Sequence, residues 1–121
     1  MRIAKFAALA VAALSVIVLS VPGFAQLPKI GCTFQGKETS LRDRCSFTSS
    51  GTLTRFIPKQ TTLEWSDGVR TQIEFLTIES LHMGVAEGTA TIDGEPATFK
   101  MASDGGKCIT VIKSGNFVCY R

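Results

Sequence analysis

The chain has 121 residues, of which 45% are hydrophobic and 19% are charged, and its formal net charge is +3. Residues 1–25 contribute only Arg2 and Lys5 to this charge, so the rest of the chain carries eleven bases against ten acids. That near-neutral balance does not supply the attraction that nucleic-acid phosphates require, and no P-loop or G-x-G-x-x-G sequence is present. Composition therefore argues against a nucleic-acid or nucleotide partner.

Residues 1–25 have the pattern of a secretory signal peptide. A short positive start precedes an uncharged run over residues 6–21, and small residues occupy the two positions that a leader peptidase reads. The run is shorter than the roughly 20 residues of a membrane-spanning helix, which makes a retained anchor the less favoured alternative. We predict cleavage before Gln26, a periplasmic or secreted location, and no transmembrane segment in the mature domain.

The mature domain contains all four cysteines: Cys32, Cys45, Cys108 and Cys119. Their wide spacing differs from the close pairs of zinc sites and of redox motifs, so we predict two structural disulfides, no metal and no cofactor. Two pairings stay open. Short loops favour bridges between sequence neighbours, whereas a final hairpin that pairs Ile112 with Phe117 sets Cys119 opposite Thr110 and favours bridges between the first and last segments.

Short alternating runs of Thr, Val, Ile and Phe, separated by turn signals, indicate an all-β chain behind the leader. We expect strands around Cys32, over residues 45–48, over residues 53–57 and in three later hairpins. Residues 78–83 are the only candidate for a helical turn, and strand or loop fits them equally. The prediction is one domain over residues 26–121, a small antiparallel barrel or sandwich of about seven to nine short strands stapled by two disulfides.

Residues 61–78 predict the clearest hairpin. A three-residue loop over residues 66–68, with Gly68 in the left-handed conformation, separates an apolar face from a polar face. On the apolar face the register pairs Trp65 with Val69, Leu63 with Thr71 and Thr61 with Ile73. On the polar face it pairs Glu64 with Arg70, Thr62 with Gln72 and Gln60 with Glu74. We expect Trp65 and Ile73 to lie in the core.

The dipeptide Asp93-Gly94 predicts a second hairpin with a two-residue turn. Its register pairs Ile92 with Glu95, Ala90 with Ala97 and Gly88 with Phe99. Phe99 then lies over the bare backbone of Gly88. The six phenylalanines of the mature domain occupy strand-like runs, and we expect them in the core rather than as a stacking platform.

Catalytic constellations are sparse. His82 is the only histidine, and no G-x-S-x-G sequence accompanies it. A pair of carboxylates suited to glycoside hydrolysis is the remaining option, but the predicted hairpin gives Glu64 and Glu74 ordinary cross-strand partners. We therefore predict that the chain is not an enzyme, and a small carboxylate-based hydrolase is the third of three hypotheses.

Charge is distributed unevenly along the mature chain. Residues 26–60 sum to +4, residues 61–95 to −6 and residues 96–121 to +3. One interpretation is a dipolar molecule, in which the two ends of the chain pack together, the bases form one side and the acidic middle forms the other. Solvated strand faces whose signs cluster by chance are the simpler interpretation.

A rigid disulfide-held β domain suits recognition better than chemistry. The first hypothesis is an exported, non-enzymatic binding or inhibitor module that uses its acidic middle to recognise a basic protein partner. Its candidate binding residues are Glu64, Asp67, Glu79, Glu87, Asp93 and Glu95. Periplasmic inhibitors of lysozyme are similar in this general architecture of leader, small β domain and disulfides.

The alternative is an envelope-associated structural protein that holds an anionic wall polymer or lipid headgroups. It would use the basic ends of the chain, namely Lys29, Lys37, Arg42, Arg44, Arg55, Lys59, Lys107 and Lys113. Both contacts are electrostatic, so salt separates the two hypotheses only in part. Charge reversal in the acidic middle or in the basic ends separates them better.

Overall fold

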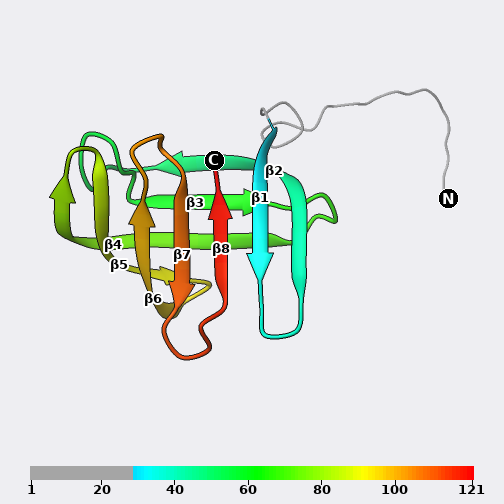
Figure 1. The fold of residues 1–121 in the computed structure, drawn as a ribbon. Coiled ribbons are helices and arrows are strands. Elements are labelled where there is room, and N and C mark those ends of the chain that lie inside the picture. Colours follow the sequence, from blue (N-terminus) through cyan, green and yellow to red (C-terminus); the bar gives the residue numbers. More distant parts are fainter. Residues whose placement is uncertain (1–28) are drawn as a thin grey trace, which may run out of the picture.

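The computed structural model describes residues 29–121, so the predicted signal peptide lies outside the described residues. Eight antiparallel strands follow one another around a closed barrel, and the first pairs with the last (Figure 1). Their bounds are β1 (Lys29–Gln35), β2 (Ser40–Ser50), β3 (Gln60–Glu64), β4 (Arg70–His82), β5 (Val85–Ile92), β6 (Glu95–Met101), β7 (Lys107–Val111) and β8 (Phe117–Tyr120). The all-β prediction is confirmed, and of its two forms the barrel is the one found.

The core lies inside the barrel because side chains alternate between its two faces. On β6, for example, Ala97, Phe99 and Met101 are buried while the residues between them are exposed. Phe75 and Phe99 meet at the centre edge to face, with ring centroids 5.0 Å apart. This geometry is favoured between aromatic rings, and it places two of the predicted core phenylalanines there.

The hairpin of β3 and β4 has the predicted register at all five strand pairs. Gly68 has a φ of 90°, and the amide of Trp65 donates to the carbonyl of Val69 at 2.9 Å. Trp65 and Ile73 are buried as expected, and the indole Nε1 of Trp65 donates to Thr71 Oγ1 at 2.9 Å. That bond satisfies the one polar atom of the indole inside the core.

The hairpin of β5 and β6 is also confirmed, with Gly88 opposite Phe99. Asp93 and Gly94 have φ values of 50° and 85°, as a type I′ turn requires. Two irregularities in the pairing of β4 with β5 bring the carbonyl of Thr77 against Gly88. A side chain at position 88 would therefore meet backbone as well as the Phe99 ring.

The expected strand over residues 53–57 is wrong. This segment is a loop that crosses one end of the barrel between β2 and β3, where Leu53 N and Thr54 N both donate to the carbonyl of Ile57. Ile57 is buried in the core, whereas the neighbouring Phe56 is 71% exposed. The expected burial of Phe56 is therefore also wrong, because the loop turns inward through Ile57 and Leu53 instead.

Residues 78–83, left open between helix, strand and loop, continue β4 as far as His82. The strand then turns at Met83 and Gly84, which both have positive φ values. The turn packs near Ser103, since a Cβ placed on Gly84 would lie 3.7 Å from the Ser103 Cα. The outcome is a long hairpin of β4 and β5 rather than a helical turn.

The final hairpin of β7 and β8 differs from the expected register by two residues. Thr110 rather than Ile112 lies opposite Phe117, which sets Cys108 directly opposite Cys119. A wider turn causes the shift, with Val111 N bonded to Asn116 O and Gly115 N bonded to Val111 O. The geometric objection to a bridge across this hairpin therefore disappears.

The disulfides join Cys32 with Cys45 and Cys108 with Cys119, which is the short-loop alternative. The first bridge spans a diagonal between β1 and β2, with Cα atoms 6.0 Å apart, and lies inside the barrel. The second links directly opposed residues of β7 and β8 on the outer face, with Cα atoms 4.1 Å apart. Two disulfides are typical of exported proteins.

No helix within residues 29–121 is both long enough and apolar enough to cross a membrane.

Candidate functional site

The six acidic residues predicted as a binding surface fall in two places. Glu64 and Asp67 lie at the turn between β3 and β4, and Asp93 and Glu95 lie at the turn between β5 and β6. In an up-and-down barrel these two turns share one end. Glu79 on β4 and Glu87 on β5 point outward farther along the barrel wall.

Four of these acids already have partners that serve the fold. Glu64 pairs with Arg70 at 3.9 Å, and Glu87 pairs with Lys100 at 3.8 Å. Asp67 Oδ1 accepts the Val69 amide, and Asp93 Oδ1 accepts the Gln72 amide, each at 2.9 Å. Asp67 therefore caps its own turn and Asp93 ties its turn to β4, so these two carboxylates serve the fold and the outer wall is the better candidate site.

A groove of about 570 Å³ lies on that wall, across the outer faces of β4 to β8. We call it the acidic groove, and it is lined by Glu79, Glu87, Gly88, Thr98, Phe99, Lys100, Cys108, Thr110 and Phe117. Phe117 supplies apolar surface there, so the expectation that it lies in the core is wrong. The groove joins two of the predicted binding residues, Glu79 and Glu87, to residues of three other strands.

The register explains why these side chains meet. Glu87 lies opposite Lys100, Lys100 lies opposite Cys108, and Cys108 lies opposite Cys119. Residues that face one another across successive antiparallel strands point to the same side of the sheet. One row of outward side chains thus crosses β5 to β8, and the outer disulfide forms its last two positions.

A second groove of about 360 Å³ continues this row toward β1. We call it the basic groove, and it is lined by Gly31, Thr33, Lys100, Ala102, Asp104, Gly106, Lys107, Cys108, Cys119, Tyr120 and Arg121. It shares Lys100 and Cys108 with the acidic groove, so the two adjoin. Together they form a trough with carboxylates at one end and bases at the other.

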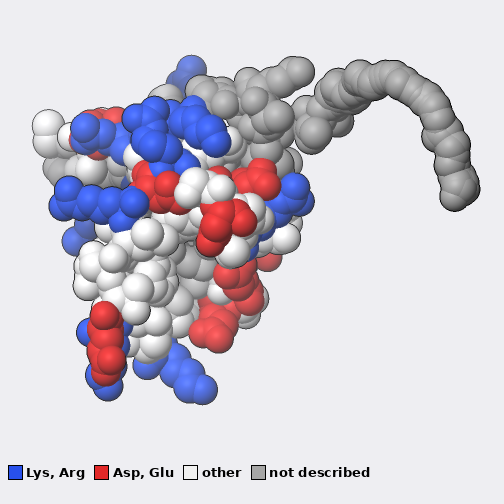
Figure 2. Space-filling view, turned by 90° about the vertical axis from the view of Figure 1, so that its right-hand side faces the viewer, with Lys and Arg blue, Asp and Glu red and all other residues white. Residues whose placement is uncertain are grey.

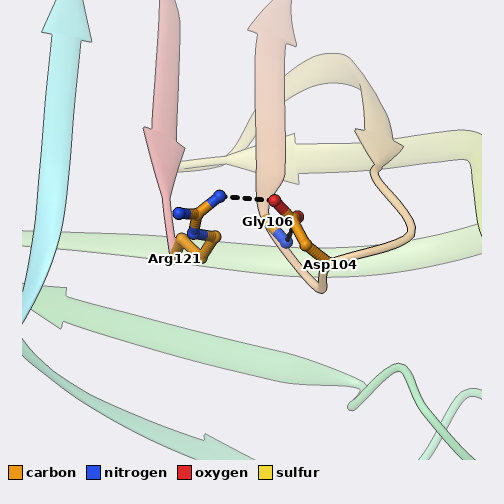
Figure 3. A network of polar contacts seen from close by, with 3 residues as sticks. All are labelled: Asp104, Gly106 and Arg121. Carbon is orange, nitrogen blue, oxygen red and sulfur yellow. Dashed lines mark hydrogen bonds and ion pairs between the residues drawn. The ribbon is translucent and has the colours of Figure 1, made fainter.

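An ion pair fixes one wall of the basic groove (Figure 3). The guanidinium of Arg121 binds Asp104 Oδ2, and Asp104 Oδ1 accepts the Gly106 amide at 2.9 Å. The Gly106 amide is the main cause that lowers the pKa of Asp104, and the Arg121 charge acts in the same direction. These contacts tie the end of β8 to the turn between β6 and β7.

Lys107 of β7 also borders this groove, and the register places its side chain on the inner face of the sheet with Met101 and Tyr120. It is half-buried, and its Nζ lies 5.8 Å from the centroid of the Tyr120 ring on the opposing strand. Burial lowers the pKa of Lys107 because it penalises the charged ammonium. Within residues 29–121 no carboxylate forms an ion pair with it.

We expect Tyr120 to ionise far above the ordinary tyrosine range. Burial raises its pKa from 10.0 to about 12, and the neighbouring Thr61 acts in the opposite direction. Between pH 10 and pH 12 the unfolded chain loses the phenolic proton while the folded chain keeps it. Stability therefore falls as the pH rises through this window, by about 2 kcal/mol.

The measurement is direct because Tyr120 is the only tyrosine of the chain. Its ultraviolet absorbance reports one ionisation, and urea unfolding at each pH reports the stability. Tyr120→Phe is the control, since it removes the ionisable hydroxyl and should lose this pH-dependent part. Ionisation of the folded protein near pH 10 would contradict the burial of this side chain.

The ends of the chain do pack together, because β1 pairs with β8. Figure 2 shows one face of the barrel, with many basic side chains across its upper part, acidic side chains below and to the right of them, and both signs again at the lower edge. The fold thus brings the two basic ends of the chain together, as the dipolar interpretation requires. Several opposite charges still meet as exposed pairs, such as Lys59 with Glu74 at 3.6 Å.

Sequence reasoning missed several groove residues, chiefly Lys100, Phe117 and Arg121. Outward alternation in each strand was the available signal, but it identifies neighbours only when the registers of all the strands are known. No cluster of three His, Cys, Asp or Glu side chains suited to a metal occurs in the part of the chain that the structure describes. Comparisons with protein-family models, with curated proteins and with solved structures find no match to this chain.

Proposed function

We propose that the chain is an exported, non-enzymatic binding module that recognises a protein partner at the acidic groove, and that an inhibitor role is one form of this binding. The observation that supports it most is the position of Glu79 and Glu87 at an outward groove that also exposes Phe117. An apolar patch bordered by charge is the usual anatomy of a protein-binding surface. The proposed location is the periplasm or the exterior of the cell.

The interior of the barrel supports an external site. Leu63, Phe75 and Ile109 are completely buried and fill the space between the walls. Small barrels of eight strands are typically wide enough only for their own side chains or for one small ligand. The outer trough offers a longer surface, which suits a segment of a protein.

The ion pair of Glu87 with Lys100 does not block this role. Both side chains are more than half exposed, at 53% and 67% respectively, and exposed pairs contribute only about 0.2 to 1 kcal/mol. A basic side chain of the partner can therefore replace Lys100 at Glu87 for little free energy. Within the described residues 29–121, the Thr77 hydroxyl at 3.5 Å is the one polar contact of Glu79, which leaves its charge available.

The experiment begins with capture of a partner from native envelope extract by the oxidised protein. The affinity of the captured protein is then measured for two variants with the same change in net charge, Glu79→Lys/Glu87→Lys and Asp67→Lys/Glu95→Lys. We expect the first to weaken binding at least tenfold, equivalent to about 1.4 kcal/mol, and the second to change it less than threefold.

Equal losses in the two variants would mean that general charge attraction, not the groove, drives binding. Retention of full affinity by both would show that the partner uses another face. Turnover of a wall glycan that a single Glu79→Gln change abolishes, with the fold intact, would instead favour the hydrolase hypothesis.

A further inference from the structure

We propose that one end of the barrel docks on the surface of an anionic phospholipid membrane, where exposed apolar side chains enter the interface and basic side chains face the headgroups. Three connections share this end, namely the loop over residues 51–59, the turn of β4 and β5 at Met83 and Gly84, and the turn over residues 102–106 (Figure 1). We call it the docking end. It is separate from the acidic groove, so the proposal goes beyond protein recognition there and does not require it.

The docking end exposes large apolar side chains on two of its connections. Phe56, in the loop over residues 51–59, is 71% exposed, and Met83, in the turn after β4, is 84% exposed. Leu81 and Val85, on the two strands that meet at this turn, are exposed as well. Phe56 and Met83 line neither the acidic groove nor the basic groove. This apolar surface gains free energy if a membrane interface removes it from water.

Charge distinguishes the docking end from the opposite end of the barrel. Among the described residues, its connections and the strand residues that adjoin them carry five basic side chains against one acidic side chain. The bases are Lys29, Arg55, Lys59, Lys107 and Arg121, and the acid is Asp104. The opposite end, counted in the same way, carries three basic against five acidic side chains. The docking end is therefore complementary in charge to an anionic lipid surface, which attracts nearby basic residues.

Arg55 and Phe56 bring charge and apolar surface together in one loop. Both side chains are exposed, and the guanidinium carbon of Arg55 lies 5.7 Å from the centroid of the Phe56 ring. Arg55 forms no ion pair with a carboxylate within residues 29–121. Apolar side chains at the acyl boundary beside basic side chains at the headgroups are typical of binding in the plane of a membrane interface. We place this pair at the centre of the contact.

The loop that carries this pair is fixed to the barrel. The amides of Leu53 and Thr54 donate to the carbonyl of Ile57, whose side chain is buried in the core. The amide of Phe75 on β4 donates to the carbonyl of Lys59 at 2.9 Å. Docking therefore requires little ordering of the loop.

The arrangement of the apolar side chains favours a lipid surface over a protein partner. They lie on separate connections, with basic residues between them in the sequence. A protein partner would need a complementary packed surface for each of them, because the core of a protein interface is packed as densely as a protein interior. A fluid lipid interface adapts to each side chain independently.

The test uses the protein as the cell exports it, expressed with its leader and purified in oxidised form. Cosedimentation measures its binding to vesicles of phosphatidylglycerol and phosphatidylethanolamine in equal parts, and to vesicles of phosphatidylcholine alone. We expect saturable binding to the anionic vesicles and binding about tenfold weaker to the neutral ones. Residues before Lys29 are the same in every variant, so they contribute equally to each measurement.

Two double variants locate the surface. Phe56→Ser/Met83→Ser should weaken binding to the anionic vesicles about tenfold, because it removes the apolar contacts. Val69→Ser/Ile112→Ser is the matched control, since both residues are exposed and apolar but lie at the opposite end of the barrel. We expect the control to change binding less than threefold. All four side chains are exposed, so both variants should unfold at the same urea concentration as the wild type.

The electrostatic part is tested separately. Arg55→Gln should weaken binding to the anionic vesicles several-fold and leave binding to neutral vesicles unchanged. Lys113→Gln removes the same charge from the opposite end and should have no effect. Glu79→Lys/Glu87→Lys should bind vesicles at least as well as the wild type, so failure of the proposed protein recognition and failure of membrane docking are distinguishable.

Three results would overturn the proposal. The first is the absence of saturable binding of the wild-type protein to the anionic vesicles. The second is an equal loss in the two double variants, which would show that exposed apolar residues act without regard to their position. The third is a Phe56→Ser/Met83→Ser variant that keeps vesicle binding but loses self-association or a protein partner, which would assign the docking end to a protein contact.

Discussion

Replacing Gly88 with alanine should destabilise the barrel by about 3 kcal/mol or more, above the usual cost of overpacking. A Cβ at this position would lie 1.9 Å from the carbonyl oxygen of Thr77 and 2.8 Å from Cε1 of Phe99. The phenylalanine ring has some freedom to move, but the carbonyl belongs to the backbone of β4. The methyl group therefore fits only if β4 and β5 separate.

Urea unfolding followed by the fluorescence of Trp65, the only tryptophan, measures this cost. Gly31→Ala is the matched control, because the added methyl group would meet nothing within 4 Å and Gly31 does not have a positive φ. We expect the control to stay within about 0.5 kcal/mol of the wild type. A Gly88→Ala variant as stable as the control would show that β4 does not approach β5 this closely.

The same contact links the core to the surface. Gly88 and Phe99 are core-side residues of β5 and β6, yet both also line the acidic groove. Phe99 is only 3% exposed, so this pair borders the groove from its inner side.

The two central hairpins were predictable because local rules agree with tertiary packing in them. Gly68 and the pair Asp93-Gly94 fix the turn types, and the turns fix the registers. A register shift of one residue between β3 and β4 would bury Glu64 or Arg70 in place of Leu63. Burial of the core therefore selects the same register as the turn. Trp65 and the contact of Phe99 with Gly88 follow from those registers.

The loop between β2 and β3 was not predictable in the same way. Leu53 and Ile57 read as part of a strand, but the chain has to cross the end of the barrel here, and Ile57 fills that end. Burial of one residue of such a segment depends on the closed barrel around it. The alternation of apolar residues along the sequence does not depend on that closure. It therefore predicts a strand here, with Phe56 in the core.

The trough escaped prediction for a related reason. It depends on a row that runs from Glu87 to Cys119 through two further strands, so one wrong register removes it. The turn of residues 111–116 has no sequence pattern typical of a two-residue turn. The expected pairing of Ile112 with Phe117 therefore placed β8 two residues out of register with β7. Charge alone identified three of its residues, Glu79 and Glu87 at the acidic end and Lys107 at the basic end.

Removal of the inner disulfide should cost more than removal of the outer one. The sequence separations are similar, 13 for Cys32–Cys45 and 11 for Cys108–Cys119, so loop closure contributes about 3 kcal/mol in each case. Cys32 and Cys45 are 3% and 0% exposed, and their replacement by alanine also leaves a cavity in the core. We expect about 4 to 5 kcal/mol for Cys32→Ala/Cys45→Ala and about 3 kcal/mol for Cys108→Ala/Cys119→Ala.

Urea unfolding of the two double variants under identical conditions measures the difference in the free energy of unfolding, in which the loop-closure contributions nearly cancel.

The position of the inner disulfide in the barrel gives it a second role. Both disulfides join strands that are already neighbours in sequence, so neither of them crosses the seam between β1 and β8. Cys32 lies on that seam opposite Tyr120, and the bridge holds β1 at the point where the seam depends on it. If loss of the outer disulfide costs as much as loss of the inner one, then neither the buried cavity nor the seam limits the stability of the barrel.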